Sequence, residues 1–211
     1  LEESLELREK NDNEHQHQIT LGEWDITERE MEIFKSLYDA EILYQDTLLG
    51  RLFDGLEEQG LMENTLVVIT SDHGEEFGEL NRRVGHQMSL ADRLLHVPLI
   101  MRFPEQIPAG KRLSSMASTI DIFPTILDVV EQAQGLEEPR LTNEVMAIQG
   151  VSQLPAIQGD VLVRDMIMAH HFNPTPHLMA YTQWDAQYAD GGMPPHVAKL
   201  MRTIDVLRTQ D

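Results

Sequence analysis

A short apolar run that ends in Asp-His-Gly is the feature that most constrains how this chain can fold. Residues 66–69 are rich in β-branched side chains and contain no alternating polar residue. This pattern predicts a strand that is buried on both faces, as strands of parallel sheets are. Ser71, Asp72, His73 and Gly74 follow the run directly. Because ligands bind just beyond the carboxyl ends of the strands in open α/β sheets, the sequence predicts an α/β fold with a site at this strand end.

The residues at this strand end suit a divalent metal ion. Asp72 offers a hard carboxylate oxygen and His73 offers an imidazole nitrogen. Gly74 allows the backbone to turn sharply without a steric penalty. Asp72 and His73 are therefore candidate metal ligands. The alternative is a strand end followed by a polar turn, because motifs this short also occur by chance.

A helix is expected before the strand and a functional loop after it. Thr27 and Glu30 match a capping box, apolar residues follow at helical spacing, and Gly60 is a natural stop. Residues 74–86 form a charged, glycine-rich loop that ends at His86. Long loops at the carboxyl ends of strands usually carry function, so His86 is a candidate site residue. The alternative is a surface histidine that caps the next helix.

Further elements are predicted along the rest of the chain. A short helix is expected at residues 88–95, a strand at 96–104 and a turn at 154–159. A helix is expected over 121–132, with Asp121 as its cap and Pro124 in its first turn. Its expected core positions are residues 122, 123, 126, 127 and 130. A strand over 161–169 precedes His170, His171 and His177, but two prolines among these histidines argue against a regular ligand frame.

Composition excludes several classes of partner. The formal net charge is −20, from 36 acidic and 16 basic residues, so nucleic acid and anionic membrane surfaces are not expected partners. No apolar run is long enough to span a membrane. The chain has no cysteine, which excludes disulfides and thiolate zinc sites. An anionic substrate then needs a locally cationic site, which a metal ion and histidine can provide.

Several blocks surround the strand in a fixed order. They are Tyr-Asp-Ala-Glu-Ile at 38–42, Gly-His at 85–86, His-Val-Pro-Leu-Ile at 96–100, Ile-Pro-Ala-Gly at 107–110 and Ser-Thr-Ile-Asp-Ile-Phe-Pro-Thr at 118–125. Together with the Asp-His-Gly strand, they make the chain resemble the sulfatase family of the alkaline phosphatase superfamily. The family's nucleophile motif, Cys or Ser followed by x-Pro-x-Arg, is absent. The chain therefore resembles the C-terminal part of such an enzyme.

The resemblance implies a fold and three regions. The fold expected is an alkaline-phosphatase-like mixed, mostly parallel sheet flanked by helices, with a small C-terminal antiparallel subdomain. Residues 1–26 are expected to be a polar linker or irregular segment. Residues 27–150 would form the C-terminal part of the sulfatase-like α/β domain, and residues 151–211 the small subdomain.

The resemblance also implies a chemistry, which is hydrolysis of an anionic sulfate ester. Asp72, His73 and carboxylates in a missing N-terminal part would hold a divalent metal, Ca²⁺ by family, with Mn²⁺ or Zn²⁺ open. A formylglycine nucleophile is expected outside this chain, and His86 would contact the substrate and assist the leaving group. The chain alone would then be inactive. The family also suggests a periplasmic or secreted location, which the residues themselves leave open.

Two other functions remain open on the sequence. One is a phosphonate or phosphate ester hydrolase, or a phosphoethanolamine-type transferase, of the same superfamily. The other is a truncated module that keeps the fold without catalysis. The residue at the nucleophile position separates these classes.

Overall fold

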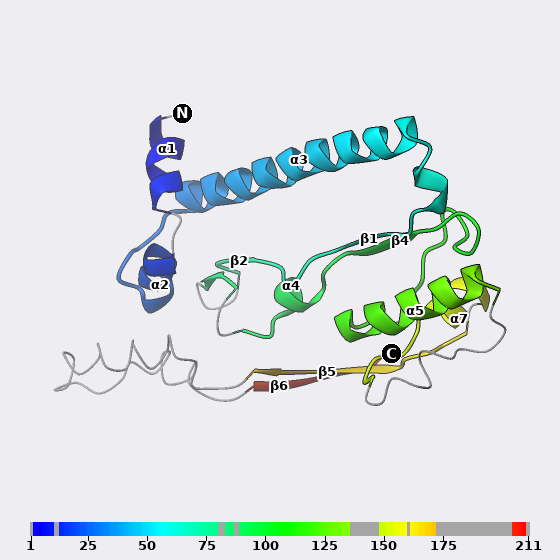
Figure 1. Ribbon diagram of the computed structural model, residues 1–211. Coiled ribbons are helices and arrows are strands. Elements are labelled where there is room, and N and C mark those ends of the chain that lie inside the picture. The colour runs from blue at the N-terminus through cyan, green and yellow to red at the C-terminus, as the bar shows by residue number, and fades with distance from the viewer. Residues whose placement is uncertain are drawn as a thin grey trace. The chain divides into compact units, whose positions relative to one another are not determined.

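The computed structural model describes residues 2–10, 13–79, 83–86, 89–135, 148–159, 161–171 and 204–209 (Figure 1). The chain divides into two compact units. The first unit comprises residues 1–59, 73–97 and 170–205, and the second comprises 60–72, 98–169 and 206–211.

Three helices build the core of the first unit. They are α1 (Glu2–Glu9), α2 (Asn13–Leu21) and α3 (Glu28–Glu58). Leu7, Ile19 and Phe34, one from each helix, are buried against one another. The structure thus differs from the linker or irregular segment expected over residues 1–26. The local sequence is polar, but its few apolar side chains gain their burial from α3, which lies further along the chain.

The long helix α3 begins as its sequence predicts. The Thr27 hydroxyl accepts a hydrogen bond from the Glu30 backbone N–H at 3.2 Å, and the Glu30 carboxylate accepts one from the Thr27 backbone N–H at 2.7 Å. These reciprocal bonds satisfy donors that every helix N-terminus leaves free, and the predicted capping box is confirmed. Gly60 follows the helix at φ +66°, a conformation that favours glycine.

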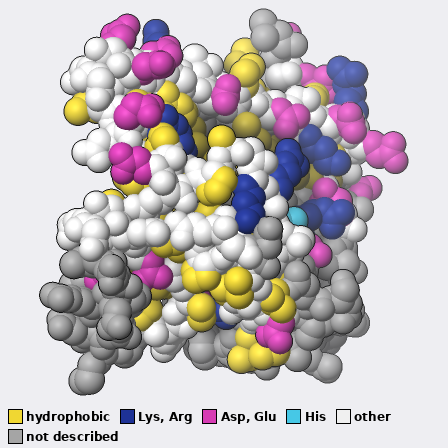
Figure 2. Space-filling model, turned by 90° about the vertical axis from the view of Figure 1, so that its right-hand side faces the viewer, with side chains coloured by type: hydrophobic (Ala, Val, Ile, Leu, Met, Phe, Trp, Pro, Cys, Tyr) yellow, Lys and Arg dark blue, Asp and Glu magenta, His cyan; other side chains and the backbone are white. Residues whose placement is uncertain are grey.

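Several large apolar side chains of α3 are exposed. Ile42, Leu43, Tyr44 and Leu52 are each more than half exposed. Outside α3, Ile100 and Phe123 are also more than half exposed. Figure 2 shows hydrophobic side chains, in yellow, on one face of the molecule. Even so, none of the helices within the described residues is sufficiently long and apolar to cross a membrane.

A small hairpin and a short helix complete the described part of the first unit. Strands β2 (Glu76–Phe77) and β3 (Val84–Gly85) pair antiparallel, with Glu76 opposite Gly85 and Phe77 opposite Val84. The Phe77 ring packs edge-on to Tyr38 of α3 at 5.3 Å between centroids. Helix α4 (Asp92–Leu95) is shorter than the helix expected over residues 88–95. The hairpin is thus anchored on α3 through an aromatic contact.

The predicted strand lies in the second unit, after a short 3-10 helix, η1 (Met62–Asn64). Strand β1 (Val67–Thr70) pairs antiparallel with β4 (Leu99–Arg102), and the two lie side by side (Figure 1). Two expectations therefore differ from the structure. The pair is antiparallel, so a mostly parallel sheet is not shown among the described strands, and Val67, Val68 and Ile69 are half-buried rather than buried on both faces.

A second core forms around α5 (Ile122–Ala133), which follows the 3-10 helix η2 (Thr119–Asp121). Phe103, Val129 and Leu154 are buried together there. Leu154 belongs to α7 (Leu154–Gly159), so the turn expected at these residues is a helix. Pro124 lies in the first turn of α5 as predicted. Two expected core residues of α5, Phe123 and Val130, are instead exposed.

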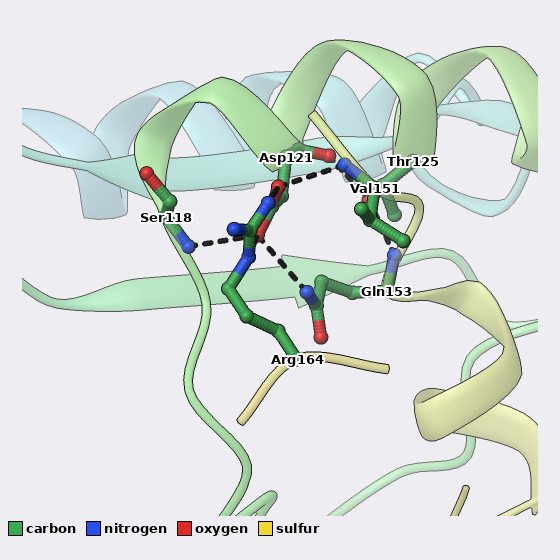
Figure 3. Close-up of polar contacts among 6 residues, drawn as sticks. All are labelled: Ser118, Asp121, Thr125, Val151, Gln153 and Arg164. Carbon is green, nitrogen blue, oxygen red and sulfur yellow. Dashed lines mark hydrogen bonds and ion pairs between the residues drawn. The ribbon is translucent and has the colours of Figure 1, made fainter. Parts of the chain in front are cut away.

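A buried carboxylate ties α5 to the chain that follows it (Figure 3). Asp121 is fully buried and accepts hydrogen bonds from the backbone N–H groups of Ser118 at 2.9 Å and Val151 at 2.8 Å. The Arg164 guanidinium donates two more, at 2.9 and 2.6 Å. The Gln153 side-chain amide donates another at 3.1 Å. Asp121 therefore does not cap α5 itself, as the sequence suggested, but joins three separate segments of the second unit.

The C-terminal strands are β5 (Met166–His171) and β6 (Ile204–Thr209), which pair with each other. Strand β5 begins later than the strand expected at 161–169. The prediction for His177 lies outside the described residues, and the side chains of His170 and His171 are likewise not described.

Candidate functional site

The two predicted metal ligands, Asp72 and His73, follow closely after the end of β1 in the sequence. Asp72 is exposed in the second unit, and His73, the next residue, is half-buried in the first unit. The Ser71 hydroxyl lies 3.5 Å from the Asp72 carboxylate. That Asp72 and His73 share one metal ion stays a prediction.

His73 is held in a defined orientation. Its Nδ1 lies 2.9 Å from the backbone carbonyl oxygen of Gly74. A carbonyl oxygen only accepts hydrogen bonds, so Nδ1 carries a proton and donates it. This hydrogen bond fixes the orientation of the ring. A hydrogen bond of this kind is the usual way in which proteins present a histidine to a metal ion.

The glycine after His73 is packed too tightly for any side chain. The Gly74 N–H donates to the carbonyl oxygen of Leu94 at 3.0 Å, which brings the two backbones together. A Cβ atom at Gly74 would overlap the carbonyl oxygen of Arg93. The glycine is therefore needed here for close backbone approach, in addition to the turn that the sequence suggested.

Replacing Gly74 by alanine is expected to destabilise the chain by about 1–3 kcal/mol, because backbone must move to admit the methyl group. Urea unfolding followed by circular dichroism measures the change. Gly50→Ala is the matched control, since it lies inside α3 with no atom within 4 Å of the added Cβ. That control is expected to be neutral or to stabilise by up to about 1 kcal/mol. Equal stabilities of the two variants would contradict the steric argument.

The hairpin brings His86 back to His73. His86 directly follows β3, and its ring stacks on that of His73 with 3.9 Å between centroids and 24° between planes. Gly85, the last residue of β3, has φ +91°, a conformation that favours glycine. The two histidines are 13 positions apart in sequence, and the pairing of β2 with β3 closes that distance. The structure thus joins two of the three predicted site residues in one place.

Glu75 is a site residue that the sequence reasoning missed. Its carboxylate lies 3.1 Å from His86 Nδ1 and is mostly buried. Because a carboxylate only accepts hydrogen bonds, His86 Nδ1 carries a proton and donates it to Glu75. In the sequence, Glu75 is one of several loop charges. Its position directly after Asp-His-Gly is the only feature of the sequence that marks it. The pairing of β2 with β3, which brings His86 close to Glu75, could not be predicted from the sequence.

A second carboxylate lies on the same hairpin in a different environment. Glu76 is almost fully buried, and burial raises its pKa. The Ser89 hydroxyl and the charge of Arg83 lower that pKa and only partly offset burial, and neither carboxylate oxygen has a hydrogen bond of good geometry. Arg83 is itself buried, and burial lowers its pKa. Glu76 lies opposite Gly85 in the ladder and so supports the strand that positions His86.

Comparisons with known proteins show which family the chain resembles. The family model described as Sulfatase matches residues 9–132, more than half of the chain. Arylsulfatase K of Xenopus laevis is 28% identical over 174 residues, covering 79% of this chain and 31% of the relative. Arylsulfatase K of Bos taurus is 37% identical over 104 residues, covering 49% of this chain and 19% of the relative. The chain spans about a third or less of the curated relatives that it matches.

Two solved structures share the fold. The phosphonate monoester hydrolase SpPMH from Silicibacter pomeroyi matches with a TM-score of 0.63 and 25% identity, over 88% of this chain and 33% of that one. BT4656, solved with its substrate D-glucosamine-2-N,6-O-disulfate, matches with a TM-score of 0.58 and 29% identity, over 70% of this chain and 28% of that one. With the matched family model and the arylsulfatase relatives, these likenesses show that the chain belongs to the sulfatase family.

Proposed function

We propose that this chain supplies the metal-binding and leaving-group side of a metal-dependent sulfate ester hydrolase. The observation that carries the proposal is the stacking of His86 on His73, with Glu75 bonded to His86. A ligand and a proton donor must lie close together to act on one ester group. The upstream polypeptide would supply the nucleophile, a formylglycine, together with further carboxylates and strands that complete a mostly parallel sheet.

The donor set fits a divalent ion held by Asp72 and His73. Asp72 offers hard oxygen, and His73, whose ring is oriented by the hydrogen bond from Nδ1 to the Gly74 carbonyl, would bind the ion through its imidazole. Ca²⁺ suits a site with several carboxylates, and the imidazole also admits Mn²⁺ or Zn²⁺. When bound, the ion would neutralise charge on the sulfate oxygens and orient the nucleophile.

His86 would act on the leaving group. Protonated at both nitrogens, it keeps Nδ1–H on Glu75 and can donate Nε2–H to the ester oxygen as the S–O bond breaks. The hydrogen bond to Glu75 holds the ring in one orientation. His86 is 39% exposed, so a substrate can reach it. The rigid backbone around Gly74 and the paired strands β2 and β3 would fix the direction of donation.

The proposal is tested in a polypeptide that contains this chain and the upstream nucleophile. An aryl sulfate should be hydrolysed, and turnover should stop on chelation and return with Ca²⁺ or Mn²⁺. Asp72→Asn should lower turnover at least about 100-fold, since metal stabilisation is worth several kcal/mol. Asp54→Asn, an exposed carboxylate of α3, is the control and should be active.

The 211-residue chain itself should show no turnover, because two protein ligands are too few for a Ca²⁺ site, which takes about 6–8 oxygens. Robust hydrolysis by this chain alone, or full activity of Asp72→Asn, would overturn the assignment.

A phosphonate or phosphate ester hydrolase is the second candidate, favoured by the likeness to a phosphonate monoester hydrolase. The same metal and proton donor would serve that reaction. Comparing turnover of an aryl sulfate with that of an aryl phosphonate in the same preparation separates the two. Hydrolysis of neither, with metal bound, would favour a module that keeps the fold without catalysis.

A further inference from the structure

Helix α2 packs against the hairpin that carries His86. Helix α2 and strand β3 are in contact, and both belong to the first unit. Ile19 of α2 is fully buried in the core of that unit, and Phe77 and Val84 of the hairpin pack against the same core. Gln16 precedes Ile19 by three positions, so both side chains lie on one side of the helix. The burial of Ile19 therefore directs Gln16 toward the hairpin.

Two polar side chains meet over Gly85. A Cβ atom added to Gly85 would lie 2.5 Å from Gln16 Oε1 and 3.2 Å from Gln16 Cδ. The same position is 3.5 Å from Glu75 Oε1. The other carboxylate oxygen, Glu75 Oε2, accepts the hydrogen bond from His86 Nδ1 at 3.1 Å. The Gln16 amide and the Glu75 carboxylate thus occupy the space that a side chain at residue 85 would fill.

The Glu75 carboxylate needs support if it is to orient His86. A glutamate side chain has several rotatable bonds, and fixing them costs conformational entropy that its neighbours must offset. The His86 ring is 39% exposed, whereas the Glu75 side chain is 17% exposed. The direction of the ring therefore depends on a carboxylate that is covered by surrounding residues. A neutral amide suits that place, because it packs beside a carboxylate without like-charge repulsion and can donate a hydrogen bond.

We propose that Gln16 is a positioning residue for the proton donor His86 and that it acts through the Glu75 carboxylate. The Gln16 amide closes the space over Gly85 and restricts Glu75 to the position from which Oε2 accepts the His86 proton. A residue other than glycine at position 85 would displace Gln16. The effect on turnover rests on the proposed function, whereas the effect on the His86 ring does not.

The placement is tested on the 211-residue chain by long-range ¹H–¹⁵N spectra of the histidine rings, which report the nitrogen that carries the proton. The His86 signal is the one that disappears in His86→Ala. In the parent its proton should reside on Nδ1, and in Gln16→Ala it should be shared between Nδ1 and Nε2. Gln18→Ala is the matched control, since it removes the same amide from the same helix and should leave the signal unchanged. An unchanged His86 signal in Gln16→Ala would overturn the proposal.

Turnover in the longer polypeptide tests the route through Glu75. Gln16→Ala should slow esters with poor leaving groups about 10–100-fold, the usual cost of losing an outer-shell partner. Gln16→Leu should be slowed similarly, because it fills the space without an amide. In a Glu75→Ala background, Gln16→Ala should cost less than about 2-fold, since no carboxylate remains to be positioned.

Parental turnover in Gln16→Leu would reduce Gln16 to a filler of space and would overturn the proposal. So would an undiminished loss from Gln16→Ala in the Glu75→Ala background, because Gln16 would then act independently of Glu75. The ring spectra need no turnover, so they decide the placement of His86 even where the hydrolase assignment fails.

Discussion

Replacing His86 by alanine in the longer polypeptide is expected to slow hydrolysis about 10²–10⁴-fold for esters with poor leaving groups. The reason is that such alcohols depart as anions only at high cost unless a proton arrives with bond breaking. His86 is the donor that we propose, because its ring stacks on that of His73 and its Nδ1 is held by Glu75. Esters of acidic phenols need little help and should be slowed much less. The measurement is turnover across a series of esters of increasing leaving-group pKa.

Metal affinity distinguishes His86 as a proton donor from His86 as a metal ligand and from His86 as a residue with no part in the chemistry. Ca²⁺ or Mn²⁺ binding should change little in His86→Ala, because those ions would be held by Asp72, His73 and upstream carboxylates. A variant that loses the catalytic metal and slows all esters alike would make His86 a ligand of that ion. His96→Ala is the matched control, since it removes an exposed imidazole outside the hairpin. A flat profile at the rate of the parent would leave His86 with no part in the chemistry.

The elements that the sequence predicted well are those set by local patterns. The capping box of Thr27 and Glu30 depends on residues three apart, and the structure confirms it. The apolar run before Asp72 identified β1 to within one residue. The direction of its partner strand was not predictable, because side-chain burial in a run of four residues is the same for parallel and antiparallel neighbours. The partial burial of β1 could not be predicted either, since burial depends on which other elements cover the strand.

The parts that were missed depend on contacts between distant residues. Helices α1 and α2 are polar locally, and their buried residues Leu7 and Ile19 find their partner Phe34 only in α3. Glu75 gained a role because the pairing of β2 with β3 carries His86 across to it. The Asp121–Arg164 ion pair joins residues 43 positions apart, and no local pattern marks it. Asp72, His73 and His86 were predicted from the strand end and the loop after it, whereas Glu75 was found only through the fold.

Replacing Asp121 by alanine is expected to lower the free energy of unfolding by about 3–5 kcal/mol, the cost of breaking a buried ion pair from one side. Asp121 is fully buried, and its removal leaves the Arg164 guanidinium and the N–H groups of Ser118 and Val151 without their acceptor. Urea unfolding at neutral pH measures the loss. Glu63→Ala is the matched control, since it breaks an exposed pair with Arg102 in the same unit and should cost less than about 1 kcal/mol.

The free energy of unfolding contributed by Asp121 is expected to fall as the pH is lowered. Burial raises the pKa of Asp121, but the hydrogen bonds from Arg164, Val151 and Ser118 outweigh it and hold the pKa below its ordinary value of 3.8. The unfolded chain then binds a proton more readily than the folded one, so the contribution of Asp121 is fully present above about pH 4 and is lost as the pH falls through the lowered value. Asp121→Asn, which cannot ionise, should remove that part of the acid dependence while the Glu63→Ala control keeps it. A steep acid loss of equal size in Asp121→Asn would show that other carboxylates cause it and that the network in Figure 3 contributes no charge-dependent stability.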